Sequence, residues 1–425
     1  MKKNILVFPC GSEIGLEIFR SLQYSLHFNV IGANSVPDHG RFVYKNYIPD
    51  LPYVQDAGFI ERLNSVIEEY NIDLIYPTMD SVIAKLTSMT DKINCKIVSH
   101  PASTTAICLS KKKTTQLLSE SINMPMIFKR ESIYSYPVFL KPDIGYSGKN
   151  TLTAYCEKDI DNHLNKYPDC LIMEYLPGEE YTVDCFTDKE RKLMFAGSRL
   201  RSRISNGISV HALPASPEIN KELCLVGNTI NEKLHLRGAW FFQVKRSSSG
   251  ILKVMEVAAR LGGSSALFRA KGVNFAELSV WDALDKDVSI LENDYAIEMD
   301  RALDNRFVLQ LSYKKVFVDF DDTMLISGKL YIVVLAFLFQ SKNDAVSIIC
   351  LSRHKGDLNQ ALLSLGILGL FDEVIHLKND ESKADFVTND SIFIDDSFAE
   401  RKTVASKGIP VFAPDMVSAL MNTYI

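Results

Sequence analysis

Short apolar runs alternate with helical patterns over the first hundred residues, and this alternation limits the possible folds more than any other feature. Short, continuous apolar runs are typical of strands that are buried on both faces of a parallel sheet. The alternation predicts a doubly wound α/β domain over residues 1–105. The expected strands cover residues 4–8, 30–33, 73–77 and 96–98, and the expected helices cover residues 13–22 and 59–70 and begin at Ser81. The turn at residues 11–15 lacks the full G-x-G-x-x-G fingerprint, so it does not predict a dinucleotide site.

The composition narrows the class of protein. The 425 residues are enough for roughly two to four domains. An apolar content of 47% and a charged content of 23% are typical of a soluble globular protein. The net charge of −5 provides no basic surplus, so nucleic acid is not an expected partner.

The sequence shows no pattern typical of a membrane span, a signal peptide or a cysteine-based site. The longest apolar run, residues 330–339, is too short to cross a bilayer, so we expect no membrane insertion. The N-terminal residues lack the pattern of a signal peptide. The eight cysteines include no Cys-x-x-Cys pair, which argues against a zinc site and against a disulfide framework. We therefore expect a cytoplasmic protein.

The stretch from Pro137 to Thr151 (PVFLKPDIGYSGKNT) predicts a strand, a flexible loop and a second strand. The strand presents Lys141, and the glycine-containing loop at residues 143–148 can turn its backbone N–H groups toward phosphates. Because β-like sequence follows the loop, we expect a hairpin lid and not the loop–helix arrangement of a P-loop. The alternative is an ordinary Gly/Ser hairpin with a surface lysine.

Polar residues at the ends of later strands could complete a nucleotide site. The backbone that follows Glu174 can pair with the edge of an adenine, and Glu180 can accept hydrogen bonds from ribose hydroxyls. Glu256 needs a magnesium ion between its carboxylate and the phosphates, because bare like charges repel. Arg260 can neutralise a phosphoryl group during its transfer. Antiparallel strands that carry helices predict an α+β domain over residues 106–310.

Three segments of this region resemble the ATP-grasp carboxylate–amine ligases, especially the branch that includes carbamoyl-phosphate synthetase large subunits and amino-acid ligases. The segments are FLKPDIGYSGK, MEYLPGEEYTVD and VMEVAARLGGSSAL. The preceding domain, with FPCGSEIGLEI and IYPTMDS, resembles the domain that ordinarily precedes an ATP-grasp module. The resemblance covers residues 1 to about 300.

The resemblance implies a role for each matching residue. Contacts to ATP are implied for Lys111 (or Lys113), Lys141, Ser147 and Gly148 at the phosphates, Glu174 and Leu176 at adenine, and Glu180 at ribose. Gln243 and Glu256 would face the metal, and Arg260 would meet the transferred phosphoryl group. Arg203 belongs to a basic run where the family often places substrate- or phosphate-binding arginines, although a solvated strand edge is the alternative. Ala258 stands where the family often has Asn, so a two-magnesium site is in doubt.

The segment VFVDFDDT at residues 316–323 places two carboxylates, Asp319 and Asp321, at the end of an apolar strand. One carboxylate could serve as a nucleophile and the other as a general acid/base. The ordered set of motifs also includes a strand that ends in a hydroxyl, a lysine at the start of a helix and a strand that ends in a carboxylate pair. These pieces are Ser352 after residues 347–351, Lys383, and Asp395 and Asp396 after residues 391–394. Acidic strand ends that cap the following helices are the alternative interpretation.

This ordered set resembles the haloacid-dehalogenase (HAD) phosphatase superfamily over residues 313–425. The resemblance implies Asp319 as nucleophile, Asp321 as acid/base, Ser352 as phosphoryl ligand and Lys383 as the lysine that stabilises the nucleophile, with Lys378 as the alternative lysine. Asp395 and Asp396, together with Asp319 and Asp321, would hold Mg²⁺. The short gap between Thr323 and Ser347 leaves no room for a large cap domain, so we expect a capless, Rossmann-like domain.

Taken together, the sequence predicts a multidomain protein of α/β and α+β class that uses ATP and Mg²⁺. The implied reaction joins a small-molecule carboxylate, activated as an acyl phosphate, to an amine, with an appended phosphatase activity. The alternatives are an ATP-grasp kinase whose product is not an amide, and a phosphatase that residues 1–300 regulate by binding nucleotide. A homodimer is a possible assembly.

Overall fold

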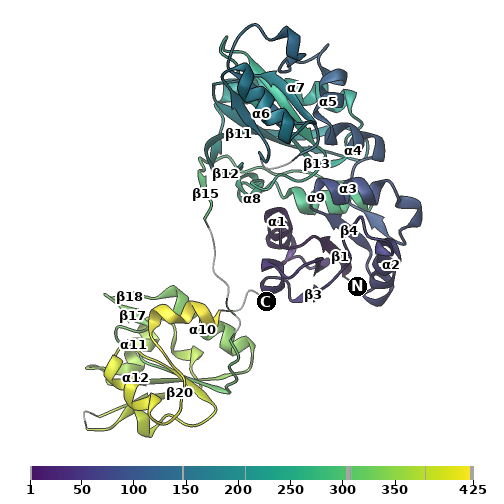
Figure 1. Cartoon of the computed structure of the whole chain (residues 1–425). Coiled ribbons are helices and arrows are strands. Elements are labelled where there is room, and N and C mark those ends of the chain that lie inside the picture. Colours follow the sequence, from purple (N-terminus) through teal and green to yellow (C-terminus); the bar gives the residue numbers. More distant parts are fainter. Residues whose placement is uncertain are drawn as a thin grey trace. The chain divides into compact units, whose positions relative to one another are not determined.

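The computed structural model describes residues 2–145, 148–205, 207–302, 307, 309–378 and 380–421. Contacts between residues separate the chain into two compact units, residues 1–303 and residues 304–425 (Figure 1). Each unit is described by itself. The division of the first unit at residues 105 and 106 remains a prediction, as does the three-domain scheme with its last boundary at residues 310–313.

The first unit begins with a parallel five-stranded sheet in the order β3-β2-β1-β4-β5. Ser12 ends the loop after β1 and caps α1, because its Oγ accepts a hydrogen bond from the Gly15 N–H at 3.0 Å. Helices α1 and α3 begin shortly after the carboxyl ends of β1 and β4. The elements are β1 (Lys3–Phe8), α1 (Glu13–Leu22), β2 (Phe28–Ala33), η1 (His39–Phe42), β3 (Asn46–Ile48), α2 (Phe59–Glu69), β4 (Leu74–Pro77), α3 (Asp80–Thr87), η2 (Thr90–Lys92) and β5 (Lys96–Ile97).

A four-stranded antiparallel sheet follows, in the order β6-β9-β7-β8. Strands β7 and β8 pair directly, so the predicted strand–loop–strand hairpin is confirmed. The elements of this part are α4 (Ala102–Leu109), α5 (Lys111–Leu118), β6 (Ile127–Phe128), η3 (Arg130–Ser132), β7 (Val138–Pro142), β8 (Leu152–Ala154), α6 (Glu157–Lys166) and β9 (Cys170–Glu174).

A six-stranded antiparallel sheet in the order β14-β13-β10-β11-β12-β15 completes the first unit. Its strands carry many of the polar residues of the candidate site. The elements are β10 (Glu180–Thr187), β11 (Leu193–Ser205), β12 (Ile208–Pro214), α7 (Pro217–Lys233), β13 (Gly238–Arg246), β14 (Leu252–Ala258), α8 (Ala266–Ala270), α9 (Phe275–Ala283) and β15 (Met299–Asp300).

The core beneath the parallel sheet is built from both ends of the first unit. Phe268, Phe275 and Val280, from α8 and α9, belong to the same buried cluster as residues of β1, α1 and β2. The rings of Phe28 and Trp281 lie 4.8 Å apart. The first hundred residues are therefore packed against a segment that follows them by more than 150 positions.

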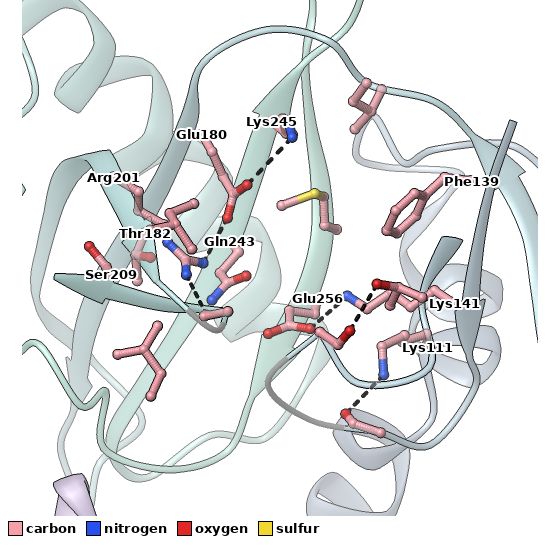
Figure 2. A pocket seen from close by; sticks show the side chains of 18 of the residues that line it. Lys111, Phe139, Lys141, Glu180, Thr182, Arg201, Ser209, Gln243, Lys245 and Glu256 are labelled. Carbon is pink, nitrogen blue, oxygen red and sulfur yellow. Dashed lines mark hydrogen bonds and ion pairs between the residues drawn. The ribbon is translucent and has the colours of Figure 1, made fainter. Parts of the chain in front are cut away.

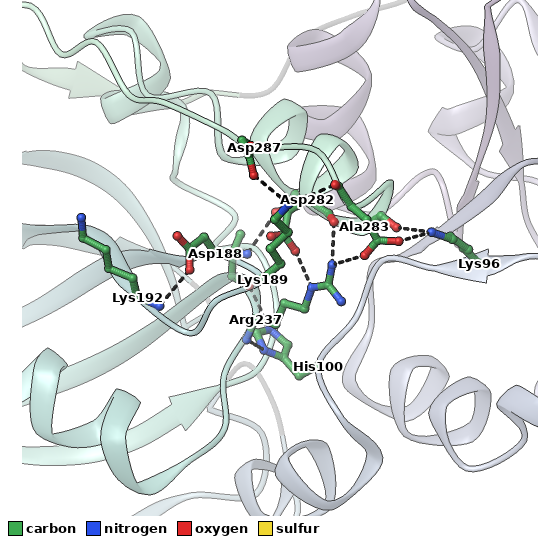
Figure 3. A network of polar contacts seen from close by, with 12 residues as sticks. Lys96, His100, Asp188, Lys189, Lys192, Arg237, Asp282, Ala283 and Asp287 are labelled. Carbon is green, nitrogen blue, oxygen red and sulfur yellow. Dashed lines mark hydrogen bonds and ion pairs between the residues drawn. The ribbon is translucent and has the colours of Figure 1, made fainter.

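Polar contacts join the same parts of the first unit (Figure 3). Lys96 Nζ lies 2.6 Å from Asp285 Oδ2, and Arg237 Nε lies 2.6 Å from Asp282 Oδ2. The buried His100 ring accepts a hydrogen bond from the Arg237 N–H at 3.0 Å and lies 3.1 Å from the Ala239 carbonyl oxygen. Burial lowers the pKa of His100 to about 4, so its ring is neutral at pH 7.

The second unit contains a parallel sheet in the order β20-β19-β16-β21-β22. The carboxyl ends of the three central strands β19, β16 and β21 meet at one edge, where Ser352, Asp319 and Asp395 follow or end them. The elements are β16 (Lys315–Val318), β17 (Leu325–Ile326), β18 (Lys329–Leu330), α10 (Ile332–Asn343), β19 (Ser347–Ser352), α11 (Leu358–Ser364), η4 (Leu368–Leu370), β20 (Glu373–His376), η5 (Lys383–Asp385), β21 (Ser391–Ile394), α12 (Phe398–Ala405), β22 (Val411–Phe412) and η6 (Pro414–Leu420). None of the helices in the described part of the chain combines the length and the apolar character that a bilayer span needs.

Candidate functional site

A cavity of about 420 Å³ in the first unit is lined by the four-stranded sheet, by the six-stranded sheet and by the loops at their ends (Figure 2). It brings together residues that lie far apart in the sequence. Of the residues predicted to contact ATP or metal, those that line it are Lys111, Lys141, Gly148, Glu174, Leu176, Glu180, Gln243, Glu256 and Arg260. Ser147 lies outside the described residues.

One of three consecutive lysines at the start of α5 reaches this cavity. Lys111 is buried, and its Nζ donates to the carbonyl oxygens of Asp143 at 3.1 Å and Gly145 at 3.3 Å. Lys112 and Lys113 are exposed, because successive residues of a helix point in directions about 100° apart. Burial, together with the charge of Lys141, lowers the pKa of Lys111. The structure therefore favours Lys111 over the alternative Lys113.

Lys141 and Glu256 form an ion pair in the cavity. Lys141, on β7, has its Nζ 2.9 Å from Oε2 of Glu256, on β14. Burial alone would raise the pKa of Glu256, but the charges of Lys141 and Lys111 outweigh it and lower that pKa to about 2. The carboxylate is therefore ionised at neutral pH and can ligate a cation. In Figure 2 these three side chains converge on one region of the cavity.

Arg260 follows β14 and is held by Asp80, at the start of α3. Its Nε donates to Oδ1 of Asp80 at 2.9 Å, and its guanidinium carbon lies 5.1 Å from the centre of the Phe241 ring. Burial would lower the pKa of Arg260, but the neighbouring Asp80 raises it. Arg260 is therefore a fixed cation that is fully charged.

The segment from Glu174 to Leu176 forms a partly apolar end of the cavity. The carboxylate of Glu174 is bound by Lys253 Nζ at 2.6 Å, and the Glu174 N–H donates to the Met126 carbonyl oxygen at 2.9 Å. Leu176 is buried. Apolar lining comes from Phe139, Met173 and Met255. Such a surface suits a flat ring with a polar edge.

Glu180 lines the same cavity, and its carboxylate is bound by two cations. Its Oε1 lies 2.7 Å from Nη1 of Arg201, and its Oε2 lies 3.6 Å from Nζ of Lys245 (Figure 2). Arg201 also donates to the Gly207 carbonyl oxygen at 2.9 Å. The carboxylate of Glu180 is therefore fixed in place before any ligand arrives.

Arg203 does not line the cavity, contrary to its predicted contact with the nucleotide. Its side chain is 59% exposed and pairs with Asp300. A regular strand would point residues 199, 201 and 203 to one face, but the pairing of β11 with β12 shifts register between Arg201 and Arg203. The arginines of β11 that line the cavity are Arg199 and Arg201.

The predicted metal ligands of the first unit are neighbours on paired strands. Gln243 on β13 and Glu256 on β14 are opposite each other in the register. Ala258, two residues beyond Glu256, offers no ligand atom. The fully ionised carboxylate beside an amide oxygen fits a Mg²⁺ ion, which prefers oxygen ligands.

Glu13 and Asp80 are two residues of the site that were not predicted from the sequence. Glu13, the first residue of α1, lines the cavity, and its Oε2 lies 2.8 Å from Nη2 of Arg301. A Cβ on Gly263 would lie 2.5 Å from Glu13 Oε1, so the glycine makes room for this carboxylate. Asp80, the first residue of α3, holds Arg260 as described above. Both residues follow parallel strands at their carboxyl ends, where open α/β sheets bind ligands, and this position could have revealed them.

The second unit has its own cluster of charged residues. Lys383 Nζ lies 2.8 Å from Asp319 Oδ1 and 2.6 Å from Asp395 Oδ2, and the three side chains are each at most 8% exposed. Burial and the charge of Asp319 raise the pKa of Asp395 to about 6, although Lys383 opposes the shift. Burial also raises the pKa of Asp319. Lys378, the alternative lysine, is exposed.

The remaining predicted residues of the second unit surround this cluster. Ser352 is buried and hydrogen-bonds to Asp319. Asp396 Oδ1 accepts from Thr323 Oγ1 at 3.2 Å. Asp321 is bound by His354, whose Nδ1 lies 2.9 Å from Asp321 Oδ2. Among the described residues, Asp319, Asp395 and Asp396 offer carboxylate oxygens that lie within 4.8 Å of one another, a set that fits a divalent cation.

Comparison with solved structures identifies the fold of the first unit. Biotin carboxylase from Campylobacter jejuni, solved as a β,γ-ATP complex, matches with a TM-score of 0.59 at 15% identity, over 69% of this chain and 74% of that one. N5-carboxyaminoimidazole synthetase from Staphylococcus aureus, complexed with ADP, matches with a TM-score of 0.58 at 17% identity, over 69% and 81%. L-amino acid ligase from Bacillus licheniformis matches with a TM-score of 0.54 at 18% identity, over 69% and 75%.

The first unit thus has the ATP-grasp fold. Residues 166–304 match a family model described as "ATP-grasp in the biosynthetic pathway with Ter operon". No curated protein matches the chain. The resemblance drawn from the three sequence segments is therefore confirmed at the level of the ATP-grasp superfamily.

Proposed function

We propose that the first unit is an ATP- and Mg²⁺-dependent ligase that joins a small-molecule carboxylate to an amine. The observation that carries this proposal is the convergence of Lys111, Lys141, Glu256 and Arg260 on one cavity. Two of the similar structures are complexes with β,γ-ATP and with ADP, and a third is an L-amino acid ligase.

Each residue has a role that its surroundings support. Lys111 and Lys141 neutralise the phosphates, and the backbone N–H groups near Gly148 contribute further donors. The polar edge of adenine meets the backbone from Glu174 to Leu176. Glu180, fixed by Arg201 and Lys245, accepts hydrogen bonds from the ribose hydroxyls. Glu256 and Gln243 hold Mg²⁺, which neutralises phosphate charge when it is bound.

The proposed reaction has two steps. The substrate carboxylate takes the γ-phosphoryl group of ATP, so that a C–O–P linkage forms and ADP leaves. The amine then attacks the acyl carbon, an amide bond forms, phosphate leaves with the electron pair of the broken C–O bond, and the amine gives up a proton. Arg260 stabilises the charge on the transferred group in both steps. The protein contributes mainly orientation and charge stabilisation.

ADP release from a panel of carboxylic acids and amines tests the proposal. Release that requires an acid and an amine together, with an amide found by mass spectrometry, supports the ligase. Release with an acid alone and a stable phosphorylated product favours the ATP-grasp kinase. No release with any acid, combined with tight ATP binding, favours a unit that binds nucleotide and regulates.

We also propose that the second unit is a HAD-like phosphatase. The buried triad Asp319–Lys383–Asp395 supports this proposal, because a lysine between two carboxylates is what an aspartyl nucleophile beside a metal site requires. Asp319 attacks phosphorus as the P–O bond to the departing alcohol breaks, and Asp321 gives that alcohol a proton. Water then hydrolyses the aspartyl phosphate and returns a proton to Asp321. Ser352 binds the phosphoryl oxygens, and Lys383 stabilises the nucleophile. Asp319, Asp395 and Asp396 hold Mg²⁺, and Asp321 stays a predicted ligand.

Hydrolysis of p-nitrophenyl phosphate with and without Mg²⁺ tests the second proposal. Metal-dependent release of phosphate that is absent in Asp319→Asn supports it. Equal rates in the wild type and the variant contradict it. The cytoplasmic location and a homodimeric assembly remain predictions.

A further inference from the structure

Three side chains outside the cavity are joined by hydrogen bonds where β11, β12 and β15 lie side by side in the six-stranded sheet. Ser202 Oγ bonds to Nδ1 of His211, and Nε2 of His211 lies 2.6 Å from Oε1 of Glu298. Ser202 is exposed, and the His211 side chain is 19% exposed. None of these three residues lines the cavity of the first unit.

Irregular strand pairing brings the three residues together. Arg201 pairs with Ala212 and Arg203 pairs with His211, so Ser202 is an extra residue with no direct partner on β12. Bulges of this kind redirect a side chain, and here they turn Ser202 toward the ring of His211. Strand β15 pairs with β12 from His211 to Ala212, which places the preceding Glu298 beside the same ring.

The charges determine which atom carries each proton. An ionised carboxylate only accepts, so Nε2 of His211 carries a proton and donates it to Glu298. In the tautomer that carries its one proton on Nε2, Nδ1 has a free lone pair and accepts. Ser202 Oγ also lies 3.3 Å from the His211 carbonyl oxygen, and its single proton is directed at Nδ1, which is nearer. This is the order of nucleophile, base and orienting acid found in activated serines.

We propose that Ser202 is a nucleophilic serine that accepts the acyl group of esters with good leaving groups. The Oγ–C bond forms as the ester C–O bond breaks, the Ser202 proton passes to Nδ1 of His211, and it then leaves with the departing alcohol. His211 is the general base, and Glu298 is a positioning residue that acts through it. The site needs neither ATP nor the cavity, so it goes beyond the ligase and the phosphatase.

Labelling of the full chain with a fluorophosphonate tests the proposal. Oγ bonds to phosphorus, the P–F bond breaks and fluoride leaves. We expect one label per chain, located on Ser202 by peptide mass spectrometry and lost in Ser202→Ala. General-base catalysis contributes about 100-fold or more, so His211→Gln should slow labelling by at least that factor. Glu298→Gln should slow it less, and Glu298→Asp should restore part of the rate.

Matched variants separate this result from general surface reactivity. Ser205→Ala removes another exposed serine of β11 and should leave the labelling rate unchanged. Ser202→Ala should leave ADP formation by the first unit unchanged. Labelling of Ser202 that is equally fast in wild type, His211→Gln and Glu298→Gln, or no label on Ser202, would overturn the proposal. Because Ser202 and Glu298 lie at the surface, their variants keep the test decisive if His211→Gln unfolds.

Discussion

Asp80 at the start of α3 accepts a hydrogen bond from Nε of Arg260 at 2.9 Å, although the two residues are 180 positions apart. The start of α3 thus orients the cation that we propose to meet the transferred phosphoryl group. We predict that Asp80→Asn lowers the kcat for ADP formation by about 10- to 100-fold, since a lost positioning contact typically costs that much. The Kd for ATP, measured by calorimetry, should stay unchanged. Asp91→Asn, at an exposed position of the same region, is the control.

Lys141 is the next residue to change, because it lines the cavity and its ammonium pairs with Glu256 there. Lys141→Ala should lower ATP-dependent ADP formation by about 100- to 1,000-fold, the usual cost of removing one preorganised charge partner. The phosphatase activity of the second unit should be unaffected, since Asp319 and Lys383 belong to another unit. Lys158→Ala, on the exposed face of α6, should behave as wild type. Full ADP formation by Lys141→Ala would contradict the assigned role.

Asp319→Asn should separate the two units functionally. The amide side chain keeps the shape of the carboxylate but cannot attack phosphorus, so hydrolysis of p-nitrophenyl phosphate should fall to background. Amide formation should continue at the wild-type rate. If amide formation also stops in a variant with a normal circular dichroism spectrum, the two reactions share a phosphorylated intermediate and the independent-site model is wrong.

His100 should make the first unit sensitive to acid. Its folded-state pKa of about 4 lies below the ordinary value of 6.5, so below pH 6.5 the unfolded chain binds a proton that the folded chain does not. The free energy of unfolding should therefore fall as the pH drops from 6.5 to 4, by about 3 kcal/mol in total. Urea unfolding followed by tryptophan fluorescence measures this, since Trp240 and Trp281 both lie in the first unit.

Two variants test whether His100 causes this acid sensitivity. In His100→Gln the slope between pH 6.5 and pH 4 should be smaller, because the amide does not titrate. His235→Gln changes an exposed histidine and should keep the wild-type slope. A slope in His100→Gln as steep as in the wild type would show that other groups cause the acid sensitivity.

The sequence was informative where one local pattern determines the outcome. The strands that present Lys141 and Glu256, and the strand end at Asp319, could be located because largely apolar runs lead to the charged residues. The choice between Lys111 and Lys113 needed the orientation of α5 on the sheet. Arg203 was misplaced because a register shift leaves no mark in the residue pattern.

The placement of two further site residues depends on long-range packing. Glu13 and Asp80 lie at ordinary helix starts, and acidic residues are common there because they favour the helix dipole. Their approach to Arg301 and Arg260 depends on contacts across 180 to 288 residues. A single sequence gives no sign of such a pairing. The position of Glu13 and Asp80 after parallel strands does, however, mark both as candidate site residues.

The shared core of β1, α1, α8 and α9 has a consequence for synthesis of the chain. The apolar underside of the first sheet is covered only when Phe268, Phe275 and Val280 have left the ribosome. A nascent chain grows at about 5–20 residues per second, so this surface stays open for roughly ten seconds or more after residue 105 is made. A fragment that stops there would keep the surface open permanently, and it should aggregate while the longer chain remains in solution.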